Sequence, residues 1–282
     1  MGIESEEIAP RDLLRGPNLN SPLPGGRLAA NVEITDLTMV VPAYNEEERL
    51  PETLAELAAF FDEGPGDVEL ILVDDGSTDS TLEVMRGWCV ERDYARELSI
   101  EHAGKAHAVR AGVAEARRGR VLFMDADLAV PLPEIRKLIS ALNEGAEVAI
   151  GSRELPGGLR EGESFARHFR GRLFNWLVAL LVVRGIWDTQ CGFKAFETPV
   201  VRHIFAESRL YNRAPTQLSG PRVTAFDVEL LFLAKRLQYT IAEVGVNWRH
   251  VPNSKVDPIR DPLQMALEVV RIRLNALLGR YP

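Results

Sequence analysis

Cysteine is scarce in this sequence, and long apolar runs are missing. The 282 residues contain two cysteines, Cys89 and Cys191, which lie far apart and lack the spacing of metal ligands. This argues against a disulfide framework and favours a reducing compartment. The longest apolar run, Trp176 to Val183, is far shorter than the roughly 20 residues of a membrane-spanning helix. We therefore expect a cytoplasmic protein in which this run forms a buried or interfacial helix.

Positive charge is also in deficit, with a formal net charge of -8. A protein that binds nucleic acid unaided normally carries a basic surface, so the net charge argues against that class. A nucleotide is still permitted, because a divalent cation or a few local cations can neutralise its phosphates. The sequence has no G-x-x-x-x-G-K-[ST] motif and no G-x-G-x-x-G after its first predicted strand. These absences exclude a P-loop and disfavour a dinucleotide-binding dehydrogenase.

From about residue 37, short apolar runs alternate with segments of helical periodicity. The predicted strands are LTMVVPAY, VELILVD, RVLFMDAD and AEVAIGSR. Such alternation predicts an α/β fold, a mostly parallel sheet with helices on both faces. Residues 1–36 include GPNLNSPLPGG and show no periodicity, so we expect a flexible tail or arm there. We place the main domain at residues 37–250 and a C-terminal amphipathic helical extension at 251–282.

Pairs of acids follow two of the predicted strands, Asp74 with Asp75 and Asp125 with Asp127. Ligands of such sheets bind beyond the carboxyl ends of the strands, where all four acids are expected. Asp-x-Asp at a strand end can present two oxygens to Mg²⁺ or Mn²⁺. The alternative for each pair is a solvated turn with a helix-capping aspartate. The shared placement of the two pairs favours a binding site.

Two cations are candidates for phosphate contacts. Lys105 follows Gly104 at the predicted start of a helix, where backbone N–H groups and an ammonium can meet phosphate oxygens. Arg153 begins an arginine-rich loop, and guanidinium groups clamp phosphates well. An exposed, solvated side chain is the alternative at both positions and is the expectation for most other arginines of this loop. Those arginines are Arg160, Arg167, Arg170 and Arg172.

Three further features have two readings each. His250 is either a third metal ligand or a packed surface histidine. Cys191 reads better as a packed small residue than as a nucleophile. The final helix carries an apolar stripe and the cations Arg271, Arg273 and Arg280. It either touches a membrane surface, peripherally at its inner face, or packs its stripe on the body of the protein. The stripe consists of Leu263, Leu267, Val270, Leu274 and Leu278.

Taken in order, the motifs of this sequence resemble those of the family 2 glycosyltransferases with the GT-A fold. The motifs are VVPAYNEEERLPETL, VDDGSTDST, AGKAHAVRAG, MDADL, GSR, DTQCGFKAF and FDVELLFLAKR. The last two, with VNWRHVPNSKVDP, are most similar to the dolichyl-phosphate β-glucosyltransferase and polyprenyl-phosphate glycosyltransferase branch. The resemblance covers about residues 37 to 275. It implies a Rossmann-like sheet and transfer of a hexose, with inversion, from UDP-glucose or GDP-mannose.

The resemblance also implies roles for individual residues. Pro42, Tyr44 and Glu46 would line the nucleotide pocket. Asp74 or Asp75 would bind the base, and Lys105 would lie near the donor. Asp125 and Asp127 would hold the nucleotide and the metal, and Asp227 would lie near the acceptor. The donor sugar site would be shaped by Gly192, Phe193 and Lys194.

Charge develops on the nucleotide as the glycosidic bond breaks, and a divalent ion on Asp127, supported by Asp125, would stabilise it. Arg153 and Lys105 would assist. The preferred acceptor is a polyprenyl phosphate, already ionised and in no need of a base. The alternative is a soluble hydroxyl acceptor, for which Asp227 would be the general base. A nucleotidyltransferase and an inactive binding module are the rival classes, and a homodimer is left open.

Overall fold

The computed structural model describes residues 32–62, 64, 66–158, 160–161, 174, 178, 181–211, 224–251 and 260–282. Of the predicted tail, only residues 32–36 belong to this described part, and β1 begins at Leu37. The run Trp176 to Val183 is described only at residue 178 and from residue 181 onward, so the prediction for it lies largely outside the described residues. Arg167, Arg170 and Arg172, and the side chain of Arg160, lie outside them too.

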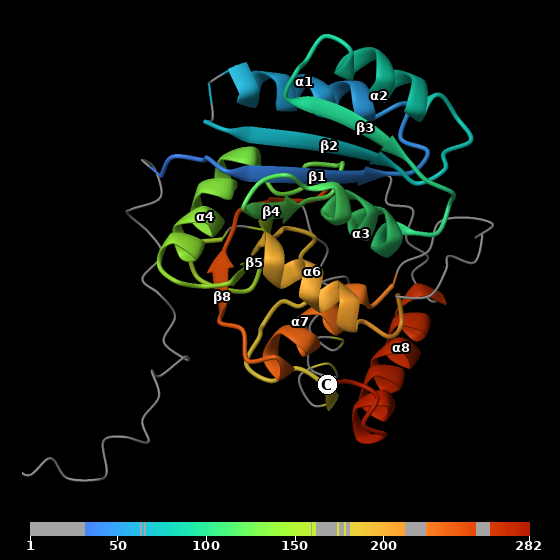
Figure 1. Cartoon of the computed structure of the whole chain (residues 1–282), viewed down its shortest axis with the longest axis vertical. Helices are drawn as coiled ribbons and strands as arrows, with labels where there is room; N and C mark the ends of the chain where they lie inside the picture. Colours follow the sequence, from blue (N-terminus) through green and yellow to red (C-terminus); the bar gives the residue numbers. More distant parts are fainter. Residues whose placement is uncertain are drawn as a thin grey trace, which may run out of the picture.

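Seven strands form one sheet in the order β3-β2-β1-β4-β7-β5-β8, and β6 and β9 form a small second sheet. The strands are β1 (Leu37–Ala43), β2 (Val68–Asp74), β3 (Ala95–Ser99), β4 (Arg120–Phe123), β5 (Val148–Ser152), β6 (Arg160–Glu161), β7 (Lys194–Glu197), β8 (Ile241–Gly245) and β9 (Trp248–Arg249). Within the large sheet, β7 runs antiparallel to both of its neighbours, and the other pairings are parallel. The predicted α/β sheet is confirmed (Figure 1).

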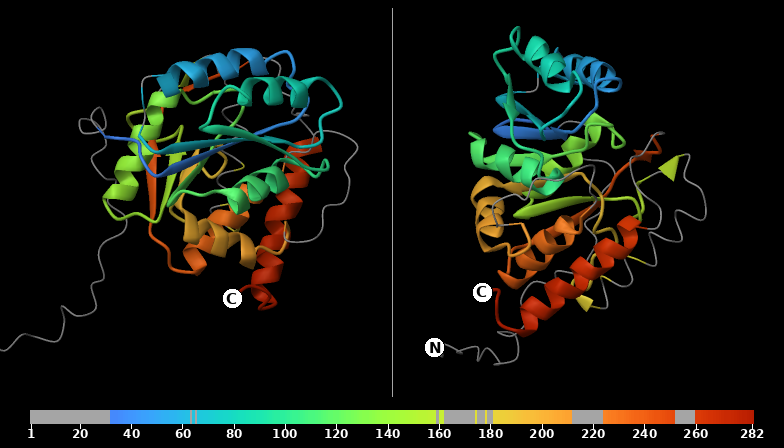
Figure 2. Two further views of the ribbon diagram at one scale, coloured as in Figure 1. Left: turned by 45° about the horizontal axis from the view of Figure 1, so that its top comes forward. Right: turned by 90° about the vertical axis from the view of Figure 1, so that its right-hand side faces the viewer.

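Helices cover both faces of the large sheet (Figure 2). They are α1 (Leu50–Asp62), α2 (Thr81–Cys89), α3 (Lys105–Glu115), the short 3-10 helix η2 (Leu132–Glu134), α4 (Ile135–Asn143), α6 (Thr198–Glu207), α7 (Phe226–Arg236) and α8 (Arg260–Leu277). Apolar residues of α1, α2 and α4 form one hydrophobic core, and those of α3, α6, α7 and α8 form the other. Successive strand residues alternate between the two, as Met39 and Val40 of β1 do, because side chains of a strand point to opposite faces.

The last helix, α8, contradicts one of the two alternatives left open for its apolar stripe. Met265, Val269 and Ile272 are buried in the core shared with α7. The stripe itself faces outward, since Leu263, Leu267, Val270, Leu274 and Leu278 are all exposed. Packing of the stripe on the body was therefore the wrong alternative. Among the described helices, none is long and apolar enough to cross a membrane.

Candidate active site

The ends of several strands surround one pocket. Its lining includes Lys105 at the start of α3, Asp125 and Asp127 just after β4, and Arg153 just after β5. Because β7 is antiparallel, the segment that leads into it, with Gly192 and Phe193, lies at the same edge of the sheet. Asp227 of α7 and His250 complete the set of candidates around a volume of about 340 Å³. Eight of the fourteen residues expected from the sequence thus meet here.

The two acids of the Asp-x-Asp motif lie together in this pocket. Burial and the neighbouring charge of Asp125 raise the pKa of Asp127 above its usual value. Lys105 forms an ion pair with Asp125. Burial opposes charge on this lysine, but Asp125 and then Asp227 raise its pKa above the ordinary value. The pocket lining therefore includes two repelling carboxylates and one ammonium that stays protonated at neutral pH.

Hard divalent cations prefer such carboxylate oxygens. Gly192 leaves the room that the Asp125 carboxylate occupies, because a Cβ at position 192 would lie 2.7 Å from Asp125 Cγ. Burial and the charge of Asp125 raise the pKa of Asp127, so the deprotonated form is disfavoured there and a bound cation would stabilise it. The donor set thus fits Mg²⁺ or Mn²⁺. Within the described residues, no three His, Cys, Asp or Glu side chains form a metal-binding group. The assignment of His250 as a third ligand stays a prediction.

Arg153 is held by an acid that the sequence reasoning did not single out. Its Nε and Nη2 donate to the two carboxylate oxygens of Asp188 at 2.7 and 2.9 Å, and its backbone N–H donates to Oδ2 at 3.0 Å. Although burial works in the opposite direction, Arg153 lowers the pKa of Asp188 to about 2. Such a bidentate ion pair fixes the orientation of the Arg153 guanidinium at the pocket wall. DTQCGFKAF contains this aspartate, but nothing in the sequence pairs it with Arg153.

Lys194 does not line the pocket but lies behind it. The side chain is completely buried, and its Nζ donates to Asp227 Oδ1 at 2.6 Å and to the carbonyl oxygen of Cys191. The expected contact of Lys194 with the donor sugar stays a prediction. In the described structure the lysine forms an ion pair with Asp227 instead. Phe193 is also almost wholly buried. Of the three donor-sugar candidates, Gly192 and Phe193 line the pocket.

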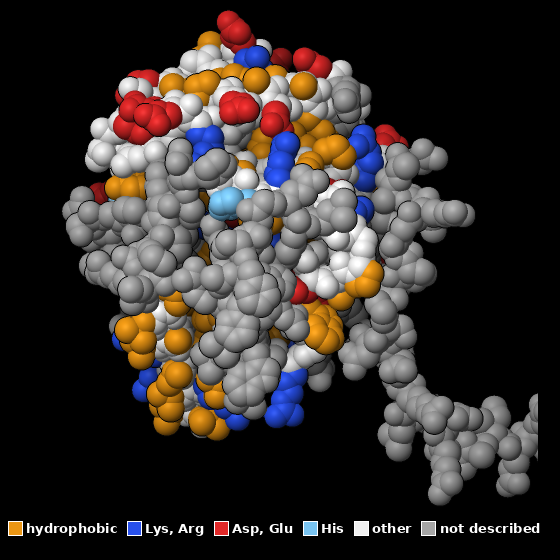
Figure 3. All heavy atoms as spheres, turned by 180° about the vertical axis from the view of Figure 1, so that it is seen from behind, with side chains coloured by type: hydrophobic (Ala, Val, Ile, Leu, Met, Phe, Trp, Pro, Cys, Tyr) orange, Lys and Arg blue, Asp and Glu red, His pale blue; other side chains and the backbone are white. Residues whose placement is uncertain are grey.

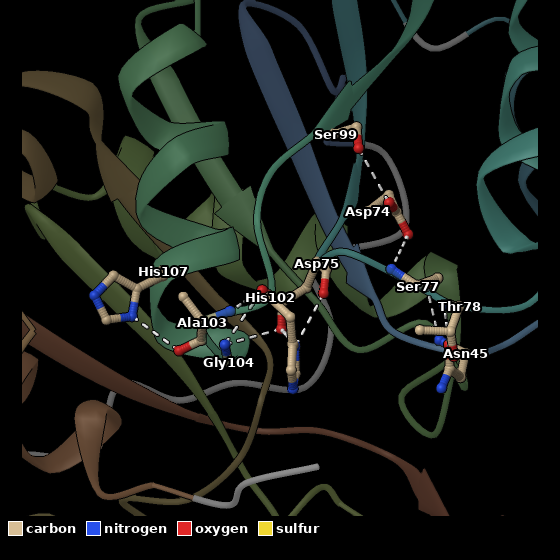
Figure 4. A network of polar contacts seen from close by, with 10 residues as sticks. All are labelled: Asn45, Asp74, Asp75, Ser77, Thr78, Ser99, His102, Ala103, Gly104 and His107. Carbon is tan, nitrogen blue, oxygen red and sulfur yellow. Dashed lines mark hydrogen bonds and ion pairs between the residues drawn. The ribbon is translucent and has the colours of Figure 1, made fainter. Parts of the chain in front are cut away.

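The other acidic pair forms a separate polar network beside the start of α3 (Figure 4). Asp74 accepts hydrogen bonds from the Ser77 N–H at 3.1 Å and from Ser99 Oγ at 3.2 Å. Asp75 accepts from the backbone N–H groups of Ala103 and Gly104, each at 2.9 Å. Both carboxylates are buried. Asp74 therefore closes the turn after β2, whereas Asp75 ties that turn to the N-terminus of α3.

His102 links this network to the first strand. Its Nδ1 lies 2.9 Å from Asp75 Oδ2, and its ring stacks on Tyr44, with centroids 3.9 Å apart and planes at 8°. Glu46 contributes a backbone N–H that donates to Thr81 Oγ1 at 2.7 Å. Pro42 is buried within β1. These candidates, with Asp74 and Asp75, form a second group that does not line the 340 Å³ pocket.

Sequence reasoning missed several residues of the site. Trp248, Gln190 and Thr224 line the pocket. His102 was overlooked, although its place directly before AGKAHAVRAG was a usable signal. The expectation for Cys191 agrees with its surroundings, since the side chain is buried and burial raises the pKa of its thiol to about 12.

Solved structures show the same fold. The chain aligns with glucosyl-3-phosphoglycerate synthase from Mycobacterium tuberculosis, crystallised with Mn²⁺, UDP and glucosyl-3-phosphoglycerate, at a TM-score of 0.61 and 24% identity, covering 92% of this chain and 85% of that one. Mannosyl-3-phosphoglycerate synthase from Rubrobacter xylanophilus gives a TM-score of 0.60 at 19% identity, covering 88% of this chain and 76% of that one. Both likenesses concern the fold.

Sequence comparison adds the family. Dolichyl-phosphate beta-glucosyltransferase of Drosophila melanogaster is 39% identical over 87% of this chain and 77% of its own length. The proteins of the same name from Homo sapiens and Dictyostelium discoideum are 36% and 34% identical, over 87% and 86% of this chain and 77% and 75% of their own lengths. The model of glycosyl transferase family 2 matches residues 38–205. The resemblance seen in the motifs is thereby confirmed, and this chain belongs to glycosyltransferase family 2.

Proposed function

We propose that this glycosyltransferase moves glucose from a nucleotide sugar to a polyprenyl phosphate of the dolichyl type. The observation that carries the proposal is the shared name of its relatives, dolichyl-phosphate beta-glucosyltransferase, at 34 to 39% identity over at least 86% of this chain. The pocket supports the same chemistry, because it combines two carboxylates for a cation with fixed positive charges for phosphate. UDP-glucose is the proposed donor.

The proposed cofactor is Mg²⁺ or Mn²⁺, held by Asp127 and Asp125. A bound divalent ion supplies positive charge to the diphosphate that leaves the sugar. The M. tuberculosis synthase has been crystallised with UDP and either ion. Lys105, next to Asp125, is placed to exchange that carboxylate for a phosphate oxygen. Arg153 presents its guanidinium in a fixed orientation on Asp188.

The acceptor determines what Asp227 has to do. A phosphate monoester is largely ionised at neutral pH, so its oxygen attacks the anomeric carbon without giving up a proton to the protein. The new bond forms on the face opposite the departing diphosphate, which inverts the configuration. Asp227 Oδ1 accepts a hydrogen bond from the Lys194 ammonium at 2.6 Å, so this oxygen is already engaged by a side chain behind the pocket. This pairing favours the phosphate acceptor over a hydroxyl acceptor.

The second group of residues is proposed to receive the nucleobase. The stacked rings of Tyr44 and His102 offer an aromatic surface beside the buried Asp75 carboxylate. Aromatic faces bind bases by stacking, and carboxylates accept from their N–H groups. Asp75 already accepts from Ala103 and Gly104, so its main contribution in this proposal is to hold His102 and the start of α3 in place.

A donor and acceptor screen tests the function. Purified chain is incubated with Mn²⁺, labelled UDP-glucose or GDP-mannose, and either a polyprenyl phosphate or phosphoglyceric acid. The expected result is UDP release with label extracted into organic solvent, from UDP-glucose and the lipid acceptor. If the label instead stays in the aqueous phase, attached to phosphoglyceric acid, the acceptor is a soluble metabolite and the lipid acceptor is contradicted. Release of pyrophosphate when UTP and glucose 1-phosphate are supplied in place of UDP-glucose, without UDP release from UDP-glucose, would indicate a nucleotidyltransferase.

A further inference from the structure

The outward face of α8 is the largest group of exposed apolar side chains in the described structure. Eight large hydrophobic side chains are exposed in the described part of the chain, and six of them lie on α8 or directly after it. Their exposed fractions run from 42% at Val270 to 67% at Leu277. Orange and blue side chains gather in this region at the lower left of Figure 3. The α8 surface is defined here as Leu263, Leu267, Val270, Leu274, Leu277 and Leu278.

Helical geometry places these six residues on one stripe. At about 100° per residue, they fall within a sector of roughly 100°, and the buried Met265, Val269 and Ile272 lie on the opposite side. The helix is therefore anchored to the protein by one face and presents an equally apolar face to the outside. Single exposed leucines are ordinary, but a continuous apolar stripe marks an interaction site.

The charged residues beside the α8 surface indicate what kind of partner it binds. Arg271 and Arg273 are exposed and lie on opposite flanks of the stripe, about 80° to either side of its centre by the same geometry. Arg280 follows the helix and is exposed as well. From Pro262 to Pro282 the sequence contains one acid, Glu268, and its side chain is buried. A chain with a net charge of -8 thus presents, over the part of α8 from Pro262 onward whose side chains are described, an apolar face flanked by arginines.

We propose that the α8 surface binds the surface of a lipid bilayer that contains anionic lipids, with α8 lying in the plane of the interface. Apolar residues in the middle and arginines at the edges match the two layers of such an interface, acyl chains and phosphate headgroups. A second copy of this chain fits less well. A symmetric pair would bring the same arginine-flanked stripes together, so the flanking cations would face one another without acids between them.

The position of α8 connects this surface to the active site. Glu268, on its buried side, accepts a hydrogen bond from the Ala225 N–H at 2.8 Å and from the Tyr211 hydroxyl at 2.8 Å. Ala225 is the residue before α7, the helix that carries Asp227. Binding of α8 to a bilayer would therefore hold the pocket near the membrane surface. This link to a lipid-borne acceptor rests on the proposed function, whereas the surface itself does not.

Vesicle binding without donor or acceptor tests the inference. The full chain is sedimented with neutral phosphatidylcholine vesicles and with vesicles that also contain phosphatidylglycerol. We expect binding to the anionic vesicles that weakens with salt. The double variant Leu267→Glu/Leu274→Glu should lower the partition coefficient at least tenfold. Arg271→Gln/Arg273→Gln should lower it about 25-fold, since each arginine near such a surface contributes about fivefold.

Matched controls lie far from α8. Val90 is 84% exposed at the end of α2, so Val90→Glu adds one negative charge elsewhere, half of what the double leucine variant adds, and should bind like the parent chain. Folding of each variant is checked by its melting temperature. The inference is overturned if the parent chain ignores anionic vesicles, if it binds neutral ones equally, or if the α8 variants bind unchanged. A dimer that the leucine variant dissociates, without vesicle binding, would overturn it in favour of self-association.

Failure of the surface and failure of the function give different results. Glucose transfer is measured separately with a detergent-dispersed polyprenyl phosphate, for which binding of α8 to a bilayer is not required. If the chain transfers glucose but does not bind vesicles, the proposed membrane-binding role of α8 is wrong and the proposed glucosyltransferase activity stands. If the chain binds vesicles but transfers no glucose, the membrane-binding role of α8 stands and the proposed glucosyltransferase activity is wrong.

Discussion

Asp227, which lines the pocket, forms an ion pair with Lys194 behind it, with Nζ 2.6 Å from Oδ1 and the lysine completely buried. Lys194 begins β7, and Asp227 lies in the first turn of α7, so the pair joins a strand to a helix more than thirty residues away in sequence. Separate roles were expected for the two residues. Their contact means that neither charge can be changed without affecting the other.

Removal of one partner should destabilise the fold much more than removal of both. Lys194→Met or Asp227→Leu leaves a buried charge without its partner, at a cost of about 3 to 5 kcal/mol in the free energy of unfolding. The double variant should lose much less than the sum. The same cycle on Arg118 and Asp67, an exposed pair at 2.6 Å, should give a coupling of about 0.2 to 1 kcal/mol. Urea unfolding measures both, and additive losses at the buried pair would contradict its assignment.

Loss of the proposed cation site should remove turnover and leave the fold intact. Asp127→Asn keeps the shape of the side chain and should lower kcat at least a hundredfold, in the range found when a stabilising charge or donor is removed. The same variant should weaken binding of Mn²⁺ in the presence of UDP, which titration calorimetry measures directly. Asp79→Asn, a change at an acid after β2, is the control. Unchanged Mn²⁺ affinity in Asp127→Asn would exclude this residue as a ligand.

Gly192 should be intolerant of even one added carbon. A Cβ there would lie 2.7 Å from Asp125 Cγ, so Gly192→Ala must move this carboxylate. We expect kcat/KM to fall about 10- to 100-fold, the range for loss of support to a metal ligand. Gly87 in α2 has nothing within 4 Å of its added Cβ, and Gly87→Ala should keep full activity and stabilise the helix by roughly 0.5 to 1 kcal/mol. Equal activity of the two variants would contradict the proposed close approach.

Acid should weaken the Arg153–Asp188 pair. The pKa of Asp188 is lowered from 3.8 to about 2 in the folded protein. Its stabilising contribution, about 2 kcal/mol, is therefore complete above pH 4 or so and is lost as the pH falls toward 2. Asp188→Asn cannot titrate, so the difference in unfolding free energy between parent and variant should shrink between about pH 4 and pH 2. Denaturant unfolding at pH 7, 5, 4 and 3 measures this, and a constant difference would refute the assignment.

Both cysteines should react slowly with thiol reagents in the native protein. Burial raises the pKa of Cys89 to about 11 and that of Cys191 to about 12, and the thiolate is the reactive form. At pH 8 we expect reaction with dithionitrobenzoate at least 100-fold slower than in denaturant. Fast labelling of one thiol, together with loss of activity, would instead indicate an accessible nucleophile at Cys191.

Local patterns predicted most of the sheet and the helices that cover it. Buried strands such as β1, β2 and β5 are short apolar runs, and helices α1 and α4 show their buried stripes in the sequence. Strands β3 and β8 were not predicted, because their residues are only partly buried and carry no continuous apolar run. The antiparallel β7 was missed as well, since strand direction is set by partners distant in sequence.

The sequence by itself determined the fold class, the family and the acids expected at the strand ends, because strand ends and motifs are local features of the chain. Only the tertiary structure decided which charges are neighbours. It placed Asp188 on Arg153 and Lys194 on Asp227, and it turned the apolar stripe of α8 outward. The physical reason is that ion pairs and burial depend on distances between segments, which the order of residues along the chain does not contain.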